Sequence, residues 1–356
     1  MIERRLAASG RVRWRVRYRT PDYRQRSRTF DRRADAEDFE AEMRGRLRRG
    51  DFVDPQRGRM TLKALWAEYE RSGMTHLRQT TQQNYRAAFR HVLAEFARWP
   101  VAKIEHGDVA EWVARLAGQK GPETVRYAHR VLCLVLDYGM RTRRLSRNVA
   151  RGVRLPSRPP ARERILSAAQ VDALAERLGE HGDLVLAMGY LGLRWSELAA
   201  LRVSDVDLVR NRVRIVERAT EVGSRMDVSA PKSRASARQV AIPAFLRPVL
   251  ISRVDGKQVD DLVFPAPGGG YLRNGNWRNR SGWRAAVTEL GLTDVTPHDL
   301  RRTFGSLARS AGADLRWIQK AMGHESITTT ARIYAHLYDD ELDRVAAALN
   351  GLRGDR

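Results

Sequence analysis

The sequence predicts a multidomain α+β fold in three parts: a small N-terminal β-sheet plus one helix, an all-helical middle, and a mixed, mainly helical C-terminal part with a small antiparallel sheet. Three patterns lead to this prediction. Residues 10–20, GRVRWRVRYRT, alternate between apolar and charged side chains, which is the two-residue period of a β-strand. Residues 60–153 carry apolar stripes at helical spacing, and helix and strand patterns mix after a proline-rich linker at 154–164.

Composition narrows the class of partner. The chain has 356 residues and a formal net charge of +23, and its length allows two or three domains with buried cores. Surface cations bind best where they displace counterions from phosphates, so the charge indicates a nucleic acid as the partner. A ribosomal or chromatin-packing protein without chemistry is the alternative that charge alone allows.

Several kinds of site are excluded or not expected. Cys133 is the single cysteine of the chain, so a disulfide or a thiolate zinc site within one chain is excluded. The histidines outside the motifs described below have no ligand spacing, and we expect no metal and no cofactor. The sequence contains no apolar run of membrane-spanning length and does not open with a signal peptide, so we expect no membrane partner and a location in the cytoplasm.

The first domain is expected over residues 1–55. A second alternating run follows the first strand at residues 26–30, after a turn, and residues 31–50 have the pattern of a helix. The apolar face of that helix consists of Ala36, Phe39, Met43 and Leu47. The sheet would pack its apolar side chains, Trp14 among them, against this helix.

The opposite face of the first strand would carry a row of like charges. The row consists of Arg11, Arg13, Arg15, Arg17 and Arg19. A sheet face that presents arginine can enter a DNA groove or follow the DNA backbone. A solvated strand face is the alternative, which we disfavour because nothing acidic lies within the row. We therefore predict that the row contacts DNA.

The second domain is expected over residues 60–153 and is all-helical. Apolar stripes mark two helices, and two more are predicted at about 107–117 and 122–141. Basic residues gather toward the end of this domain, Arg126 and Arg130 among them. A four-helix bundle without a binding role is possible, but the basic residues favour DNA contact.

The third domain is expected over residues 162–356. Ser167 and Gln170 have capping-box spacing and predict a helix that stops at Gly179. The stretch GLRWSELAAL places Arg194 at the start of another helix. The strand-like RVRIVE is followed by PKSRASARQVAI, which returns as a second strand, so we expect Lys232 on or near a β-turn.

The stretch TPHDLRRTFGS is the most informative part of the chain. Thr296 is a suitable N-cap, Pro297 fits the first helical position, and Asp299 suits the positive end of the helix dipole. His298 and Arg301 would then lie three residues apart on one face of the first turns. A helix N-terminus and a guanidinium together hold a phosphate well.

The last informative stretch, MGHESITTTARIYAHL, contributes His324 after a glycine and Tyr334 ten residues later. Taken in order, GLRWSEL, a hairpin lysine, HDLRRT, GH and this tyrosine resemble the tyrosine recombinases, the phage-integrase family. The resemblance covers about residues 162–345. The helical middle resembles the family's core-binding domain, and the first domain its arm-binding domain. Each motif alone is weak, but five in order at suitable spacing are specific.

Cleaving a phosphodiester without metal or water requires a nucleophile, positive charge at the phosphoryl oxygens and a proton donor for the leaving alcohol. Arginine keeps its charge, and its planar fork matches phosphate. We therefore expect Arg194 and Arg301 to bind the non-bridging oxygens. Forming phenolate from a free tyrosine costs roughly 4 kcal/mol at pH 7, and His298 is the candidate acceptor for that proton.

The resemblance implies roles for the remaining motif residues. Lys232 would protonate the departing 5′ oxygen, and His324 would hydrogen-bond the scissile phosphate. Tyr334 would be the nucleophile and form a 3′-phosphotyrosine. Because that bond stores the phosphodiester energy, a second strand can attack it and reseal the DNA without ATP.

Some alternatives stay open. Tyr338 is a rival nucleophile, and Lys257 is a rival acid, although its acidic neighbours suit a salt bridge in solvent. Glu197 is expected to orient Arg194 rather than to act in catalysis. The C-terminal segment, with Leu342, Val345 and Leu349 on one side, is expected to form a short helix that packs in its own domain or docks on a neighbouring subunit; we favour docking.

The resemblance implies a site-specific recombinase that integrates or excises phage or mobile-element DNA, since members that only resolve dimers usually lack the first domain. The implied partners are double-stranded DNA with core and arm attachment sites, three further copies of the chain on two DNA duplexes, and an accessory directionality factor. A dimer-resolving recombinase, a type IB topoisomerase and an inactive sequence-specific DNA-binding regulator are the alternatives.

Overall fold

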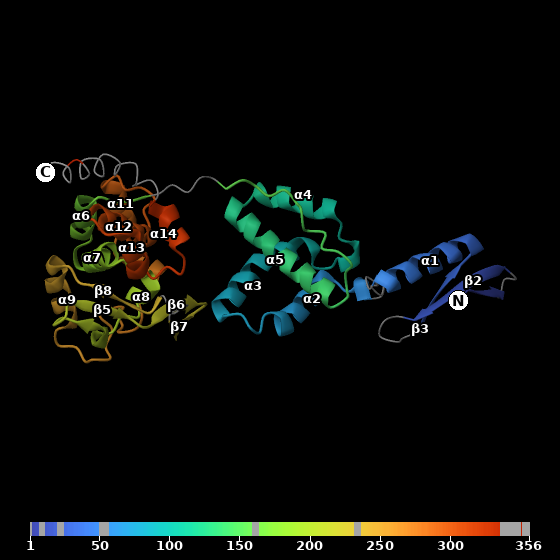
Figure 1. The fold of residues 1–356 in the computed structure, drawn as a ribbon, viewed down its shortest axis with the longest axis horizontal. Helices are drawn as coiled ribbons and strands as arrows, with labels where there is room; N and C mark the ends of the chain where they lie inside the picture. The colour runs from blue at the N-terminus through green and yellow to red at the C-terminus, as the bar shows by residue number, and fades with distance from the viewer. Residues whose placement is uncertain are drawn as a thin grey trace. The chain divides into compact units, whose positions relative to one another are not determined.

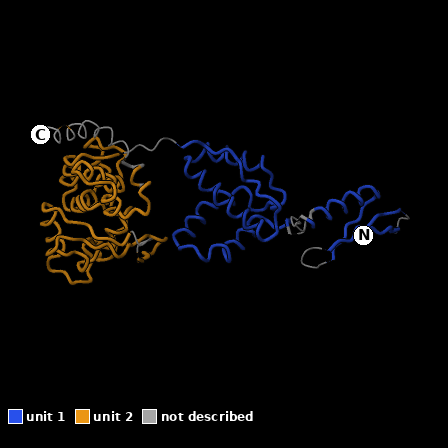
Figure 2. The backbone as a smooth tube through the Cα atoms, in the orientation of Figure 1, with its two compact units in different colours: residues 1–160 blue, residues 161–356 orange. Residues whose placement is uncertain are grey.

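The computed structural model describes residues 2–6, 11–19, 25–49, 57–158, 164–230, 236–334 and 350. The chain divides into two compact units, residues 1–160 and 161–356 (Figure 2). The α+β class is confirmed, because helices and three small antiparallel sheets make up the described ranges. None of the helices in those ranges combines the length and the apolar character needed to cross a membrane.

The chain begins with a three-stranded antiparallel sheet, β1 (Ile2–Leu6), β2 (Val12–Arg19) and β3 (Gln25–Phe30), followed by α1 (Arg33–Arg49) (Figure 1). Two of these strands and the helix were predicted, but β1 was not. The apolar side of β2 packs on α1, and Val16, Ala36, Phe39 and Met43 are buried together. The turn expected at residues 20–22 lies outside the described residues.

The remainder of the first unit is helical, as predicted (Figure 1). Its helices are α2 (Leu62–Glu68), which continues as a π-helical turn (Tyr69–Gly73), α3 (Gln79–Phe96), α4 (His106–Ala117) and α5 (Pro122–Arg141). Local chemistry explains the boundaries: the Thr61 hydroxyl accepts from the Ala64 amide at the start of α2. At α5, proline occupies the first turn, where no amide donor is needed. The apolar stripes of all four helices form one cluster.

The second unit contains nine described helices and two of the small sheets. The helices are α6 (Ala168–Leu178), α7 (Gly182–Leu191), α8 (Trp195–Leu198), α9 (Arg247–Val254), α10 (Asn274–Arg280), α11 (Trp283–Glu289), α12 (Pro297–Ser310), α13 (Leu315–Met322) and α14 (Ile327–Tyr334). Short 3-10 turns occur along the chain at Arg57–Arg59, Val101–Lys103, Gly179–His181, Val203–Asp205 and Ala244–Leu246. The predicted capping box of Ser167 and Gln170 opens α6.

The strands of the second unit correct one prediction. One sheet has the order β4 (Val206–Asp207), β5 (Arg212–Ile215), β8 (Arg238–Ala241), and β5 and β8 pair antiparallel, as expected. They are not joined by a simple turn, however, because a second hairpin, β6 (Arg218–Val222) and β7 (Arg225–Ser229), lies between them. Its signal was the two-residue loop Gly223–Ser224 between alternating segments. Residues 231–235, with Lys232, lie outside the described residues.

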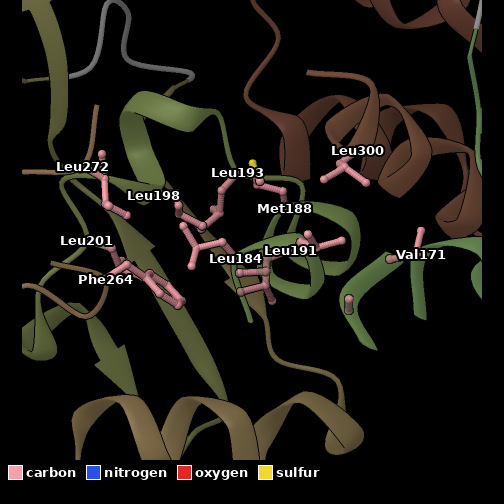
Figure 3. Close-up of a cluster of buried hydrophobic side chains, with 14 of the residues drawn as sticks. Val171, Leu184, Met188, Leu191, Leu193, Leu198, Leu201, Phe264, Leu272 and Leu300 are labelled. Atoms are coloured by element: carbon pink, nitrogen blue, oxygen red, sulfur yellow. The ribbon is translucent and has the colours of Figure 1, made fainter. Parts of the chain in front are cut away.

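The core of the second unit fixes the segment that carries Arg194. Leu191 and Leu193 precede the arginine, Leu198 follows it, and all three are fully buried in one cluster with Met188 and Phe264 (Figure 3). Burial of each such side chain contributes about 1.5–3 kcal/mol relative to exposure. The apolar residues of the GLRWSEL stretch therefore anchor the backbone on both sides of the arginine.

Candidate active site

Arg194 occupies the N-cap position of α8, as the sequence predicted. The preceding helix ends at Gly192 in the left-handed region, with φ of 63°. The Arg194 guanidinium donates to Glu197 Oε1 at 2.7 Å and to the Gly323 carbonyl at 3.2 Å. The predicted pairing of Glu197 with Arg194 is thus present. The Arg194 side chain is 34% exposed, so solvent or a ligand can reach its guanidinium.

The start of α12 is fixed by hydrogen bonds between residues close in sequence. The Thr296 amide and hydroxyl both donate to Asp299 Oδ2, at 2.9 and 2.6 Å, and Pro297 is the first helical residue. This predicted cap orients the first two turns of α12, from which His298 and Arg301 project. The two side chains differ in environment, because His298 is exposed and Arg301 is buried.

Arg301 is held from three directions. Only 2% of its side chain is exposed, and its guanidinium lies 3.7 Å from Glu197 Oε2. It donates to the carbonyls of Gly192 and Met322. A buried guanidinium is stable only when it is paired and hydrogen-bonded, so these contacts explain how a fully charged side chain tolerates the core.

Arg238 is a member of this cluster that the sequence did not reveal. Its side chain is 5% exposed, and it donates to both carboxylate oxygens of Glu197, at 2.9 and 3.1 Å. Its Nε donates to the Ala321 carbonyl at 2.5 Å. A signal was available: Arg238 lies two residues before the buried Val240 in a strand, on the same face of the sheet. A cation on a buried face requires an anionic partner.

Glu197 is the shared partner of the three arginines. Burial by itself raises the pKa of Glu197, but the hydrogen bonds and charge of Arg238, with the charges of Arg301 and Arg194, hold it at about 2. The carboxylate is therefore ionised at neutral pH. It fixes three guanidiniums relative to one another.

His324 follows α13, which ends at Gly323 with a left-handed φ of 61°. Its Nδ1 lies 3.0 Å from the Thr330 hydroxyl. Burial, then the charges of Arg301, Arg194 and Arg238, lower the pKa of His324 to about 4. The ring is consequently neutral at pH 7 and can donate one hydrogen bond while accepting another.

His298 is also neutral at pH 7. Loss of solvent around its ring lowers the pKa of His298, and the charges of Arg302 and Arg301 add to this shift, although the residue as a whole is exposed. Among the described residues, the His298 ring makes no hydrogen bond. A neutral imidazole of this kind can accept a proton.

Of two further predicted catalytic residues, the structure describes the backbone of Tyr334 and does not describe Lys232. Tyr334 is the last residue of α14, a helix that contacts α12 and α13 (Figure 1), but its side chain lies outside the described residues. Lys232, Tyr338 and the C-terminal segment with Leu342, Val345 and Leu349 lie outside them entirely.

The environment of the rival lysine differs from the expected one. The Lys257 ammonium donates to the carbonyls of Leu262 and Val263, at 3.0 and 2.9 Å. The expected salt bridge in solvent is therefore wrong. The ammonium is instead held by a local turn.

The structure thus brings Arg194, Arg301, His298 and His324 together, and it adds Arg238 to the predicted pair of Glu197 and Arg194. A cavity of about 650 Å³ between β8 and α13 has Arg238 and His324 on its wall, with Arg212, Arg316 and Lys320, whereas Arg194, Arg301 and His298 do not line it. Fixed positive charge beside neutral imidazoles suits a phosphate diester, since it binds the anion and leaves a base available for proton transfer.

Two arginines of the row in the first unit form ion pairs with acidic side chains, which the sequence did not predict. Arg13 pairs with Asp31 at 3.0 Å, and Arg17 pairs with Glu3 at 3.1 Å. Nothing acidic lies within the row itself, but the sheet brings in Glu3 from β1 and Asp31 from the residue after β3. No ion pair joins Arg11, Arg15 or Arg19 to another described residue.

Arg126 and Arg130, the two basic residues predicted to contact DNA from the helical domain, differ in exposure. Arg126 is half-buried and donates to the Pro156 carbonyl at 2.9 Å, so it ties α5 to the segment that follows the helices. Arg130 is exposed on the same helix. Of the two, Arg130 is the one whose side chain is available for a ligand.

Comparison with known proteins gives the family. Residues 162–341 match the model of the phage integrase family. Tyrosine recombinase XerC of Roseiflexus castenholzii is 34% identical over 191 residues, 54% of this chain and 54% of that protein. The prophage phiRv2 integrase of Mycobacterium tuberculosis is 26% identical over 356 residues, 96% of this chain and 93% of that protein. The chain thus spans about half the length of the XerC relative and nearly all of the phiRv2 integrase.

The fold is also that of a solved integrase. A lambda integrase tetramer bound to a Holliday junction superposes with a TM-score of 0.60, at 15% identity, over 93% of this chain and 94% of that one. The family model covers half of the sequence, and the residues within it are those that the site unites. The chain therefore belongs to the phage integrase family, the tyrosine recombinases, whose members cleave and rejoin DNA at specific sites.

Proposed function

We propose that this protein is a site-specific integrase that moves phage or other mobile-element DNA through a covalent 3′-phosphotyrosyl intermediate. The observation that carries the proposal is the convergence of Arg194, Arg301, His298 and His324 beside the helix that ends at Tyr334. A phosphate bound there would meet fixed positive charge and neutral imidazoles at once.

The proposed reaction is a pair of balanced exchanges. Tyr334 attacks the scissile phosphorus and gives its phenolic proton to His298, the bond to the 5′ oxygen breaks, and Lys232 protonates that oxygen. Arg194, the more exposed guanidinium, binds a non-bridging oxygen, the buried Arg301 adds its positive charge from behind, and His324 donates a hydrogen bond to the same phosphate. A 5′ hydroxyl from a second strand then attacks the phosphotyrosine and reverses the steps. The neutral state of both histidines at pH 7 suits these roles.

An integrase fits the chain better than a dimer-resolving recombinase. The similarity to XerC covers only 54% of this chain, whereas the similarity to the phiRv2 integrase covers 96%. The added length includes the sheet of β1 to β3 with its arginines. We propose that this domain binds arm sites, the core-binding helices and the catalytic domain bind the crossover site, and Arg130 contacts the core DNA.

The proposed assembly has four copies of the chain on two DNA duplexes. The support is the fold shared with lambda integrase, which was solved as a tetramer on a Holliday junction. An accessory directionality factor would select excision over integration. Because the substrate is genomic DNA, we place the protein in the cytoplasm of a bacterial host, at the nucleoid.

Covalent trapping tests the proposal. Wild type and Tyr334→Phe are incubated, without metal or ATP, with nicked linear DNA carrying candidate attachment sites, and DNA-linked protein is resolved after denaturation. We expect an adduct with wild type and with Tyr338→Phe, and none with Tyr334→Phe. Tight binding by wild type without any adduct would instead favour an inactive DNA-binding regulator.

A further inference from the structure

Arg238 makes more contacts with the site than a structural ion pair requires. It lies in β8, and its guanidinium donates to Glu197 through two nitrogens and to the carbonyls of Ala321 and Ser236. Four hydrogen bonds occupy the Arg238 guanidinium, and its side chain is 5% exposed, compared with 34% for Arg194. Arg238 therefore touches the groups that hold the site rather than the substrate.

The three arginines share a second anchor besides Glu197. They donate to three successive carbonyls at the end of α13: Arg238 to Ala321, Arg301 to Met322, and Arg194 to Gly323. The last carbonyls of a helix have no partner within it and carry partial negative charge. The arginines satisfy these carbonyls immediately before His324, so the position of that ring depends on all three.

We propose that Arg238 is a positioning residue for DNA cleavage, which holds Glu197 and the Ala321–Gly323 turn together and so sets the orientation of Arg194 and His324. This inference rests on the proposed function for the role of those two side chains. Arg238 joins the two anchors across separate elements, since Glu197 belongs to α8 and Ala321 to α13. Without it, Glu197 would keep Arg194 and Arg301, but the turn before His324 would lose one of its three supports.

The test compares Arg238→Gln and Arg238→Lys with wild type in the full chain. Arg253→Gln is the matched control, because Arg253 also joins a carboxylate and a carbonyl in the same unit, Asp183 at 2.6 Å and Glu180 at 2.6 Å. Three quantities are measured: the single-turnover rate of adduct formation on nicked DNA, the affinity for that DNA, and the titration of His324 by NMR.

For Arg238→Gln, we expect cleavage to fall by on the order of 100-fold with unchanged DNA affinity, the loss that a displacement of about 1 Å produces. Lysine keeps the charge but cannot bridge both Glu197 oxygens and a carbonyl with one ammonium. Arg238→Lys should therefore also cleave slowly. Arg253→Gln should cleave at the wild-type rate.

The NMR titration separates charge from geometry. The cationic and titratable groups that act on His324 are Arg301, Arg194, Arg238 and His298. Removing the Arg238 charge should raise the pKa of His324 in Arg238→Gln, and Arg238→Lys should leave it near the wild-type value. A stabilising ion pair without contact to the site would change neither the titration nor the rate.

The outcomes decide separately between the two proposals. If wild type forms no adduct, the proposed function fails whatever Arg238 does. If wild type forms an adduct and folded Arg238→Lys cleaves at the same rate, the inference is overturned, even where Arg238→Gln does not fold. Equal slowing by Arg253→Gln would likewise overturn it, because the effect would then be one of general stability.

Discussion

At the scale of single residues, Glu197 is the carboxylate on which Arg194, Arg238 and Arg301 converge. Glu197→Gln would leave these cations without their anion in a site where Glu197 is 4% exposed. Removing one partner of a buried pair lowers the free energy of unfolding by about 3–5 kcal/mol, and we expect a loss of that size in urea denaturation.

The control for this substitution is Glu289→Gln. Glu289 pairs with Arg177 at 2.5 Å, but about half of each side chain is exposed, and exposed pairs contribute little. We expect this variant to unfold at nearly the wild-type urea concentration. Equal destabilisation by both variants would mean that the buried cluster has no special energetic role.

The pKa of His324 predicts how stability depends on pH. A free imidazole titrates near 6.5, whereas burial and the neighbouring arginines lower the pKa of His324 to about 4. Between these values the unfolded chain binds more protons than the folded one, so stability falls as the pH is lowered through this window. His298 is shifted in the same direction.

Thermal unfolding from pH 7 to pH 4.5 measures this effect. His324→Gln cannot be protonated and should lose less stability over that range than wild type. The buried Glu197 carboxylate affects stability at lower pH than His324 does. The stabilisation that it contributes is complete above about pH 4.5 and is lost as the pH falls toward about 2. Parallel curves for wild type and His324→Gln would contradict the assignment of the shift to His324.

At the scale of elements, the end of α7 controls the approach of α12. Gly192 has a φ of 63°, and a Cβ there would lie 2.3 Å from a ring carbon of Phe304 in α12. Gly192→Ala would force α12, with its His298 and Arg301, away from the Gly192 carbonyl that Arg301 uses. We expect both reduced stability in urea and a lower rate of adduct formation.

Gly256→Ala provides the matched control. Gly256 has a similar φ of 67°, but no atom lies within 4 Å of the position that an added Cβ would take. It should therefore show only the cost of left-handed backbone, about 1–2 kcal/mol, with normal cleavage. If Gly192→Ala behaves like Gly256→Ala, the packing of α7 on α12 does not position the site.

At the scale of the whole molecule, the net charge of +23 is divided between cations that are already paired and cations that are not. In the first sheet, Arg13 and Arg17 have acidic partners, and Arg15 and Arg19 have none among the described residues. Each phosphate contact adds about one unit to the slope of log affinity against log salt. We expect Arg15→Gln with Arg19→Gln to lower the slope on arm DNA by about two.

The matched double variant is Arg13→Gln with Arg17→Gln. Because Asp31 and Glu3 already neutralise these two arginines, replacing them should change the slope less. Fluorescence anisotropy on an arm-site duplex across a salt series measures both variants. Equal losses would mean that the ion pairs break when DNA binds.

Local sequence was sufficient for the elements that have clear caps or apolar periodicity. The caps of α6 and α12 were predictable because their hydrogen bonds join residues three positions apart, such as Thr296 and Asp299. The helices of the middle domain were predictable from the period of their apolar residues. Among the elements that were not predicted, β1 and the β6–β7 hairpin are short strands whose stability depends on pairing with other strands rather than on local propensity.

The sequence by itself determined which residues are candidates for the chemistry: Arg194, His298, Arg301, His324 and Tyr334 stand in ordered motifs that no packing argument was needed to find. Only the tertiary structure decided which of the many arginines hold them in place. Arg238 meets Glu197 and Ala321 because β8 and α13 are brought together by the fold. The energy of a buried ion pair depends on the distance between the charges and on their burial. Neither quantity can be derived from the order of the residues alone.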